Sequence, residues 1–318
     1  MTTAAPAAGT SPPPPARKGM STGRKVLLGF GGIVIAAILL QLIFGSGGKN
    51  DAFKPQNEFK LDPWISIHIG SLDMSINKAV LYLFLASAFT IGSTLYISRR
   101  MQQRPNRLQT AVEAAYSLMK DNIAGGNMDR KTATKWFTFI GALFLFIWFC
   151  NILGYLPLPT NTEHKVDIFG AEIPSFALYA ATANISVTLA LTLVVWSIYH
   201  IEGVRAKGFI GYLKSWIPAG VEGPAVVPIF IIEVISHFVR IISLSVRLFA
   251  NILAGHLLIL FMGGGLVVLL GLAWIGPISL IAAIVFFLFE VVLIATLQAF
   301  IFATLTAIYI GGAVGESH

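Results

Sequence analysis

Long apolar segments separated by shorter polar ones dominate this chain and predict membrane-spanning helices. Four of them are close to the roughly 20 residues that cross the hydrocarbon core of a bilayer: residues 26–44, 79–97, 137–156 and 179–199. Two more, 225–261 and 278–310, would extend about 55 Å and 50 Å as single helices, against a core thickness of about 30 Å. Each must be steeply tilted or broken. The short glycine-rich link between them predicts an antiparallel hairpin of oblique helices over 225–310.

The remaining segments complete the predicted organisation. Residues 1–25, rich in Pro, Ala, Thr and Gly, are predicted to be a disordered tail. The run 26–44 is longer than a usual signal-peptide core, which favours a retained anchor helix and leaves a cleaved signal peptide as the alternative. Residues 45–78 are predicted to form an extramembrane loop, and residues 79–318 are predicted to form a membrane domain. Within that domain, apolar residues at helical spacing over 108–119 predict an amphipathic helix along the membrane interface.

Composition and charge agree with an all-α polytopic membrane protein. Hydrophobic residues make up 56% of the chain and charged residues 12%, with a mean hydropathy of +0.77, whereas soluble domains are about 25% charged. The net charge of +7 does not indicate nucleic-acid binding, because the basic residues flank apolar segments. Their distribution predicts that residues 45–78 lie outside and that the C-terminus is cytoplasmic. The single cysteine, Cys150, excludes a disulfide within the chain and a cysteine metal site.

Ionisable residues inside the fifth apolar segment are the main candidates for function. An arginine near the bilayer centre costs roughly 2.5 to 3.5 kcal/mol even on a lenient insertion scale, so such residues indicate functional sites. At 100° per residue, Glu233, Arg240, Arg247 and Asn251 fall within about 40° of one another on one helix face. Ser236 adjoins this face. The pattern therefore predicts one polar stripe along an otherwise apolar helix.

The last apolar segment contributes one charge, Glu290, which needs a partner or becomes protonated when buried. His256 is the candidate partner across the antiparallel hairpin. In that register Gln298 lies beside Arg247, and Glu233 is level with the C-terminal end near Glu316. Imidazole and a desolvated carboxyl can relay protons near neutral pH. Arginine keeps its proton and can only attract a passing carboxylate.

Blander interpretations remain open for several of these residues. Glu233 and Arg240 could extend toward the membrane interface without further function. His237 is interpreted as a packed or interfacial histidine. Asn151, in the third apolar segment, and Asn184 are either polar groups of a proton path or hydrogen-bonding residues between helices.

The runs SLSVRLFANILAGH, residues 243–256, and LQAFIFATLTAIYI, residues 297–310, resemble subunit a of the rotary ATP synthases. The resemblance covers residues 62–318. It implies a stator channel of four roughly perpendicular helices and a tilted hairpin, with two proton half-channels against a rotating c ring. Arg247 would be the essential gate between them. The residues expected to form the proton path are Asn251, His256, Glu290, Gln298, Glu233, Asn151 and Ser236.

The resemblance also implies the partners and the location. These are the c-subunit ring, the b-subunit stator stalk, the remaining ATP synthase subunits and the lipid of a bacterial plasma membrane. We expect no cofactor, metal or nucleic acid, and no nucleotide, because the chain lacks a GxxxxGK[ST] phosphate-binding motif. One departure stands out. Glu290 precedes Gln298 by eight residues where the family pattern has seven, which would turn its side chain by about 100° in a regular helix.

Two other classes of protein compete with this interpretation. A self-contained secondary transporter could use the same relay, but transporters often carry internal repeats, and none is visible here. A passive membrane anchor leaves a mid-membrane arginine unexplained. The transported ion, H⁺ or Na⁺, would be set by the carboxylate of the partner ring.

Overall fold

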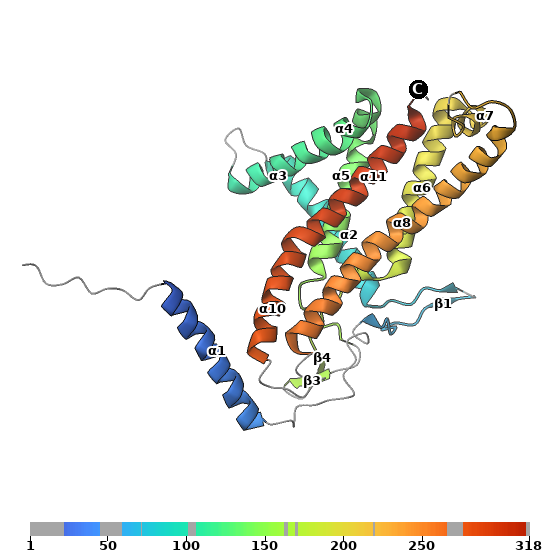
Figure 1. The fold of residues 1–318 in the computed structure, drawn as a ribbon. Helices are drawn as coiled ribbons and strands as arrows, with labels where there is room; N and C mark the ends of the chain where they lie inside the picture. The colour runs from blue at the N-terminus through green and yellow to red at the C-terminus, as the bar shows by residue number, and fades with distance from the viewer. Residues whose placement is uncertain are drawn as a thin grey trace, which may run out of the picture.

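The computed structural model describes residues 22–44, 59–70, 72–100, 106–161, 165–168, 171–218, 220–265 and 276–315. Helices dominate these residues (Figure 1). Five described helical stretches are long and apolar enough to cross a membrane: Lys78–Tyr96, Arg130–Leu153, Ile185–Lys207, Gly223–Gly265 and Gly276–Val314. The predicted all-α polytopic membrane fold is therefore confirmed, and so are its two over-long apolar segments.

The N-terminal helix α1, Thr22–Phe44, stands apart from the main bundle in Figure 1 and contacts α10. It begins within the residues predicted as a disordered tail, whose first 21 residues lie outside the described part. It is not one of the five candidate spans. The anchor helix over 26–44, with a cleaved signal peptide as its alternative, stays a prediction.

The three spans that precede the hairpin are α2, Lys78–Arg100, α5, Arg130–Leu153, and α6, Ile185–Lys207. The predicted first residues of α5 and α6 were wrong, because the position of a capping residue decides where each helix begins. Asp129 accepts hydrogen bonds from the backbone N–H groups of Lys131 and Thr132, so α5 begins before residue 137. Hydrogen bonds from Thr132 also lower the pKa of the exposed Asp129. Asn184 caps α6 through Ser186, so α6 begins after residue 179.

The short elements lie at the two ends of the bundle. At the end that carries the C-terminus are α3, Arg107–Ser117, a π-helical segment Leu118–Ala124, α4, Gly125–Asn127, and α7, Phe209–Lys214. At the other end are two antiparallel strand pairs, β1, His68–Ile69, with β2, Leu72–Asp73, and β3, Lys165–Ile168, with β4, Ala171–Pro174. Turns of 3-10 helix precede α6 at Ala181–Ala183 and α8 at Gly223–Ala225.

The predicted hairpin consists of two long helical rods that run side by side (Figure 1). The first is α8, Val226–Leu260, an unbroken helix of 35 residues followed by a π turn at Phe261–Gly265. The second contains α10, Gly276–Phe289, a π turn at Glu290–Ile294, and α11, Ala295–Val314. Because α8 is continuous and about 52 Å long, tilting rather than breaking must fit it to a bilayer.

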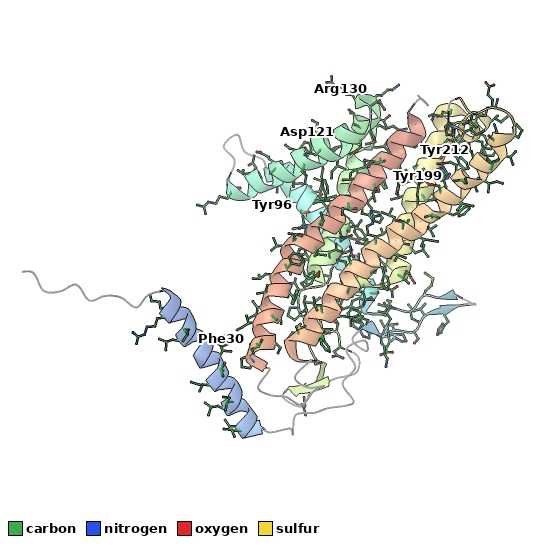
Figure 2. All side chains as sticks on the ribbon, viewed as in Figure 1. Phe30, Tyr96, Asp121, Arg130, Tyr199 and Tyr212 are labelled. Carbon is green, nitrogen blue, oxygen red and sulfur yellow. The ribbon has the colours of Figure 1, made fainter. Side chains whose placement is uncertain are left out.

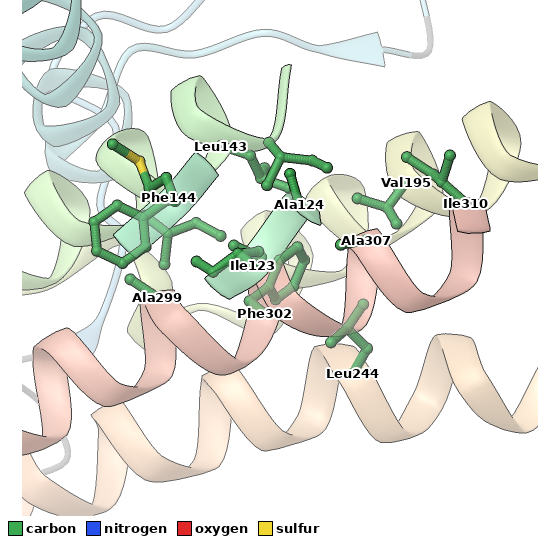
Figure 3. Packing of buried hydrophobic residues seen from close by; sticks show 14 of the residues in the cluster. Ile123, Ala124, Leu143, Phe144, Val195, Leu244, Ala299, Phe302, Ala307 and Ile310 are labelled. Atoms are coloured by element: carbon green, nitrogen blue, oxygen red, sulfur yellow. The ribbon is translucent and has the colours of Figure 1, made fainter. Parts of the chain in front are cut away.

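The core is centred on α11, which packs against α5 and α6. Ala295, Ala299, Ala303 and Ala307 recur every four residues and are completely buried. This spacing places them on one helix face, where their small side chains let the neighbouring backbones approach closely. Figure 3 shows two of these alanines beside Phe302, close to Leu244 of α8. The small-residue face therefore holds α11 in the bundle, while α8 lies against its flank.

The predicted amphipathic helix over 108–119 is only partly a surface element. Asn106 caps α3 by accepting from the N–H of Gln109. The π-helical segment that follows buries Met119, Ile123 and Ala124 in the core cluster that includes α11 residues. This segment therefore packs into the bundle, and only α3 retains the expected peripheral position (Figure 1).

Candidate functional site

Arg247 lies near the middle of α8, on an exposed face. Its Nη2 makes a long contact of 3.5 Å with the hydroxyl of Ser243, one turn earlier. Within the described part of the chain Arg247 has no acidic partner. The exposed side chains near it on the same helix, Ile242 and Val246, are apolar. Asn251 is exposed one turn further along. A fixed charge is thus held on an apolar surface with no counter-ion from this chain.

Gln298 is buried in α11. No hydrogen bond joins Gln298 and Arg247 among the described residues, and the expected position of Gln298 beside Arg247 stays a prediction. Arg247 points away from the core and Gln298 into it, because they occupy differently exposed faces of the hairpin.

A buried polar cluster, the Glu290 cluster, lies nearer the end opposite the C-terminus. We define it as Gly154, Tyr155, His256 and Glu290. The hydroxyl of Tyr155 donates to Oε2 of Glu290 over 3.1 Å. The Tyr155 ring also stacks on His256, with ring centroids 4.4 Å apart. Burial raises the pKa of Tyr155, and Glu290 adds to this, so the phenol keeps the proton that it donates.

His256 is completely buried and does not bond directly to Glu290, which corrects the predicted pair. Its Nε2 lies 3.0 Å from the carbonyl oxygen of Gly154, and its Nδ1 lies 3.0 Å from that of Ile252. A neutral imidazole has one N–H and donates to only one of these carbonyls, whereas the imidazolium donates to both. Tyr155 therefore stands between the two ionisable groups and links them.

The π turn at Glu290–Ile294 resolves the eight-residue spacing between Glu290 and Gln298. A π turn contains one more residue than an α turn, so it absorbs the extra residue without rotating α10 relative to α11. The Glu290 side chain therefore still points toward α8, whereas in a regular helix it would be rotated away. A Cβ built on Gly255 would collide with the Glu290 carboxyl group. The antiparallel register is thus within one residue of the predicted opposition of His256 and Glu290.

Asn151 joins three helical elements beside this cluster. The side-chain oxygen of Asn151 accepts from the hydroxyl of Thr182 over 2.7 Å, and its amide donates to the carbonyl of Ala295 over 3.0 Å. Trp148, on the same helix, donates to the hydroxyl of Thr296. These bonds fix α5 to the first turn of α11, next to the π turn. Asn184 serves as a helix cap here.

A second polar region, the Glu233 cavity, lies toward the end that carries the C-terminus. Its volume is about 370 Å³, and it is lined by Tyr199, Tyr212, Ser215, Trp216, Pro218, Glu233, His237, Arg240, Ile308, Tyr309, Gly312 and Ala313. Figure 2 labels Tyr199 and Tyr212 at this end of the bundle. Arg240 donates to Oε1 of Glu233 over 3.4 Å and lies over the Tyr309 ring. Ser236 is half-buried and does not line the cavity.

The cavity agrees with two expectations from the sequence. His237 is buried and packed against the rings of Tyr199, His200 and Trp216, and its Nδ1 also lies 3.0 Å from the Tyr199 hydroxyl. Glu233 is level with Tyr309 to Ala313, in agreement with the predicted register. Glu316, which that register placed nearby, lies outside the described residues.

An apolar section of the hairpin separates the two polar regions. Leu244, Leu248 and Ile252 of α8 are buried in one cluster that also includes Ala299 and Phe302 of α11 (Figure 3). Arg247 occupies an adjoining, exposed side of the same turns of α8. The polar regions are therefore separated within the protein by packed side chains, and the arginine is located between them.

Sequence reasoning missed the tyrosines. Tyr155 and Tyr199 each contact an ionisable residue of the hairpin, but neither stands in the hairpin itself. Tyr155 follows Gly154, where any larger residue would collide with Ala180. The run NILGYLP signalled a helix end, and nothing in it indicated a partner more than a hundred residues away. Among the described residues, no group of three His, Cys, Asp or Glu could hold a metal ion.

Among the described residues, five apolar helices with ionisable groups on both sides of a central arginine define a multi-pass membrane protein with charged groups inside its spans. The family model described as ATP synthase A chain matches residues 80–311. The chain is 36% identical over 248 residues to ATP synthase subunit a of Rubrobacter xylanophilus, covering 77% of this chain and 87% of that protein. It is 32% identical over 270 residues to ATP synthase subunit a of Brucella ovis, covering 83% and 98%. The chain belongs to the ATP synthase A chain family.

Proposed function

We propose that this chain is the stator subunit of a proton-translocating ATP synthase, in which it forms two proton half-channels against a rotating c ring. The main support is the position of Arg247. A guanidinium on an apolar, membrane-depth surface is costly unless it meets water or a counter-charge. Since no acidic residue of the described part pairs with it, a partner that presents carboxylates in sequence to this surface fits best.

The two polar regions supply the half-channels in this proposal. Protons enter through the Glu290 cluster, past His256 and Asn251, and neutralise a carboxylate of the ring. After rotation they leave through the Glu233 cavity. Arg247 attracts each returning carboxylate and, because it keeps its own proton, does not conduct protons between the regions. Asn151 supports the path by holding the helices that line it, Gln298 lies on the hairpin helix that faces the path, and Ser236 lies beside its inner part.

Orientation and partners follow from the same proposal. In this proposal the C-terminal end lies in the cytoplasm of a bacterial cell, and the basic residues after α2 and α6 support that orientation. The exposed face of α8 meets the c ring, other exposed faces meet lipid, and a b-subunit stalk holds the chain against rotation. The chain itself performs no nucleotide chemistry. Its dependence on the c ring separates this function from that of a self-contained transporter.

The decisive test replaces Arg247 in the assembled complex. We expect Arg247→Ala to reduce ATP-driven acidification of inverted vesicles by more than about tenfold, as expected for loss of one fixed electrostatic group. A raised passive proton leak through the membrane sector would accompany it, because the two half-channels would no longer be separated.

The matched control is Arg205→Ala, which removes an exposed arginine at the end of α6 that pairs with Glu202. It should pump normally. Equal amounts of subunit in the membrane are checked for both variants. Normal pumping by Arg247→Ala would overturn the proposed function, because the separation of the half-channels depends on this residue.

A further inference from the structure

Two donors from α8 approach the same oxygen atom of Glu233. Nη2 of Arg240 lies 3.4 Å from Oε1, and Nε2 of His237 lies 3.9 Å from this atom. Within the described part of the chain, no hydrogen bond reaches Oε2. The carboxyl group of Glu233 is therefore approached by donors at Oε1, and Oε2 is left free to exchange a proton with the cavity.

The ring of His237 is positioned from behind by Tyr199. The hydroxyl of Tyr199 lies 3.0 Å from Nδ1 of His237. The Arg240 guanidinium is close enough to act on this hydroxyl electrostatically. Its positive charge favours the arrangement in which the lone pairs of the Tyr199 oxygen face Arg240 and the hydroxyl hydrogen points to Nδ1. The neutral imidazole then carries its one hydrogen on Nε2, the atom that faces Glu233.

The Nε2 atom of His237 is otherwise unexplained. It is buried, and it has no hydrogen-bond partner within reach among the described residues. Leaving a buried polar atom unpaired costs free energy, so such an atom indicates an absent water molecule or a function. Here it lines the Glu233 cavity, where either a bridging water or a small shift of Glu233 would complete the bond.

We propose that His237 is a positioning residue for proton exchange at Glu233. With its hydrogen fixed on Nε2 by Tyr199, it faces Oε1 beside Arg240, where a bridging water or a small shift completes the bond. This holds Oε1 and leaves Oε2 as the atom that takes up and releases the proton. The inference rests on the proposed function, in which Glu233 belongs to the cytoplasmic half-channel. Oε2 takes its proton from cavity water and releases it to cavity water. No proton passes through the imidazole.

In the part of the chain that the structure describes, the charged and titratable groups around Glu233 come from four elements. Besides His237 and Arg240 on α8, they are Tyr199 on α6, Tyr212 on α7 and Tyr309 on α11. His200 on α6 packs edge-on against His237, with ring centroids 4.9 Å apart, but it does not line the cavity. Its Nδ1 is already bonded to the carbonyl of Trp196. His200 is therefore a matched control, since it is a neighbouring histidine without access to Glu233.

The test measures proton pumping per ATP hydrolysed in inverted vesicles, with the cytoplasmic side facing the medium, as the pH of the medium is varied. His237→Leu removes one of the two donors that face the carboxylate, which makes its charged form less favourable. The alkaline limb of the profile should move upward by up to about one pH unit, as expected for loss of one donor facing a charged group. His237→Gln, which retains an N–H donor, should restore most of the original profile, and His200→Leu should leave it unchanged.

A second variant keeps the inference testable if His237→Leu does not assemble. Tyr199→Phe retains the ring but loses the hydroxyl, so it should produce a smaller shift in the same direction. An unchanged profile for Tyr199→Phe and for any assembled His237→Leu overturns the inference. A shift in His200→Leu equal to that of His237→Leu also overturns it. Pumping by Arg247→Ala would instead overturn the proposed function itself, whatever the His237 variants show.

Discussion

At the scale of single residues, the ionisable groups of the hairpin could be predicted from sequence, but the small and aromatic residues that hold them could not. Glu233, Arg247, His256 and Glu290 stand out because charges are rare in apolar segments. Gly255 carries no such signal. It matters because the Glu290 carboxyl occupies the space where any larger side chain would extend.

This contact predicts the effect of a single methyl group. Gly255→Ala should displace the Glu290 carboxyl from the Tyr155 hydroxyl and destabilise the local packing by roughly 1 to 3 kcal/mol. We expect ATP-driven pumping to fall severalfold while the subunit remains in the membrane. Gly264→Ala is the control, because nothing lies within 4 Å of a Cβ at that position. Equal pumping by the two variants would show that the position of Glu290 is unimportant.

At the scale of elements, the existence of the helices was predictable and their irregularities were not. Apolar length identified α2, α5, α6 and the two long rods, whereas caps such as Asp129 moved their ends by several residues. The π turn at Glu290–Ile294 was visible only indirectly, as a spacing that did not fit a regular helix. Its stability depends on tertiary contacts, since Asn151 and Trp148 bond to the residues that follow it.

The π turn leads to a prediction about deletions. Removing Val292 should convert the π turn into an α turn and leave Glu290 facing Tyr155 and Gly255, because only the extra residue is lost. Pumping should stay within about twofold of the original. Removing Leu305 from the regular part of α11 should instead rotate all preceding residues by about 100° and abolish pumping.

Both deletion variants need a check that the subunit is present in the membrane at normal levels. If the Val292 deletion lost pumping as completely as the Leu305 deletion, the π turn would not be the element that accommodates the eight-residue spacing.

At the scale of the whole molecule, the two polar regions lie toward opposite ends of one tilted hairpin. Glu233 and His256 are 23 positions apart on the unbroken α8, which corresponds to about 35 Å along the helix axis. This separation follows from helix length and was accessible from the sequence. The cavity volume and the route of Tyr155 into the Glu290 cluster depend on how five spans pack, which no local pattern encodes.

The proposed orientation predicts the sidedness of labelling. Cys150 is buried, and in a Cys150→Ala background Lys214→Cys should react with a membrane-impermeant maleimide only in inverted vesicles. Met74→Cys, at the opposite end of the bundle, should react only in intact cells. Both positions are exposed. The reverse pattern would place the C-terminus outside and exchange the roles of the two polar regions.

The apolar section between the polar regions has an electrical consequence. If water reaches the Glu290 cluster from one side and the Glu233 cavity from the other, each region takes the potential of its own compartment. The transmembrane voltage then falls almost entirely across the few residues around Leu244, Leu248 and Ile252, with Arg247 on their exposed side. A charge carried past this section gains about 2.3 kcal/mol per 100 mV over a short distance. The local field there is several times the average across the bilayer, and in the proposed function it acts where the ring carboxylates pass.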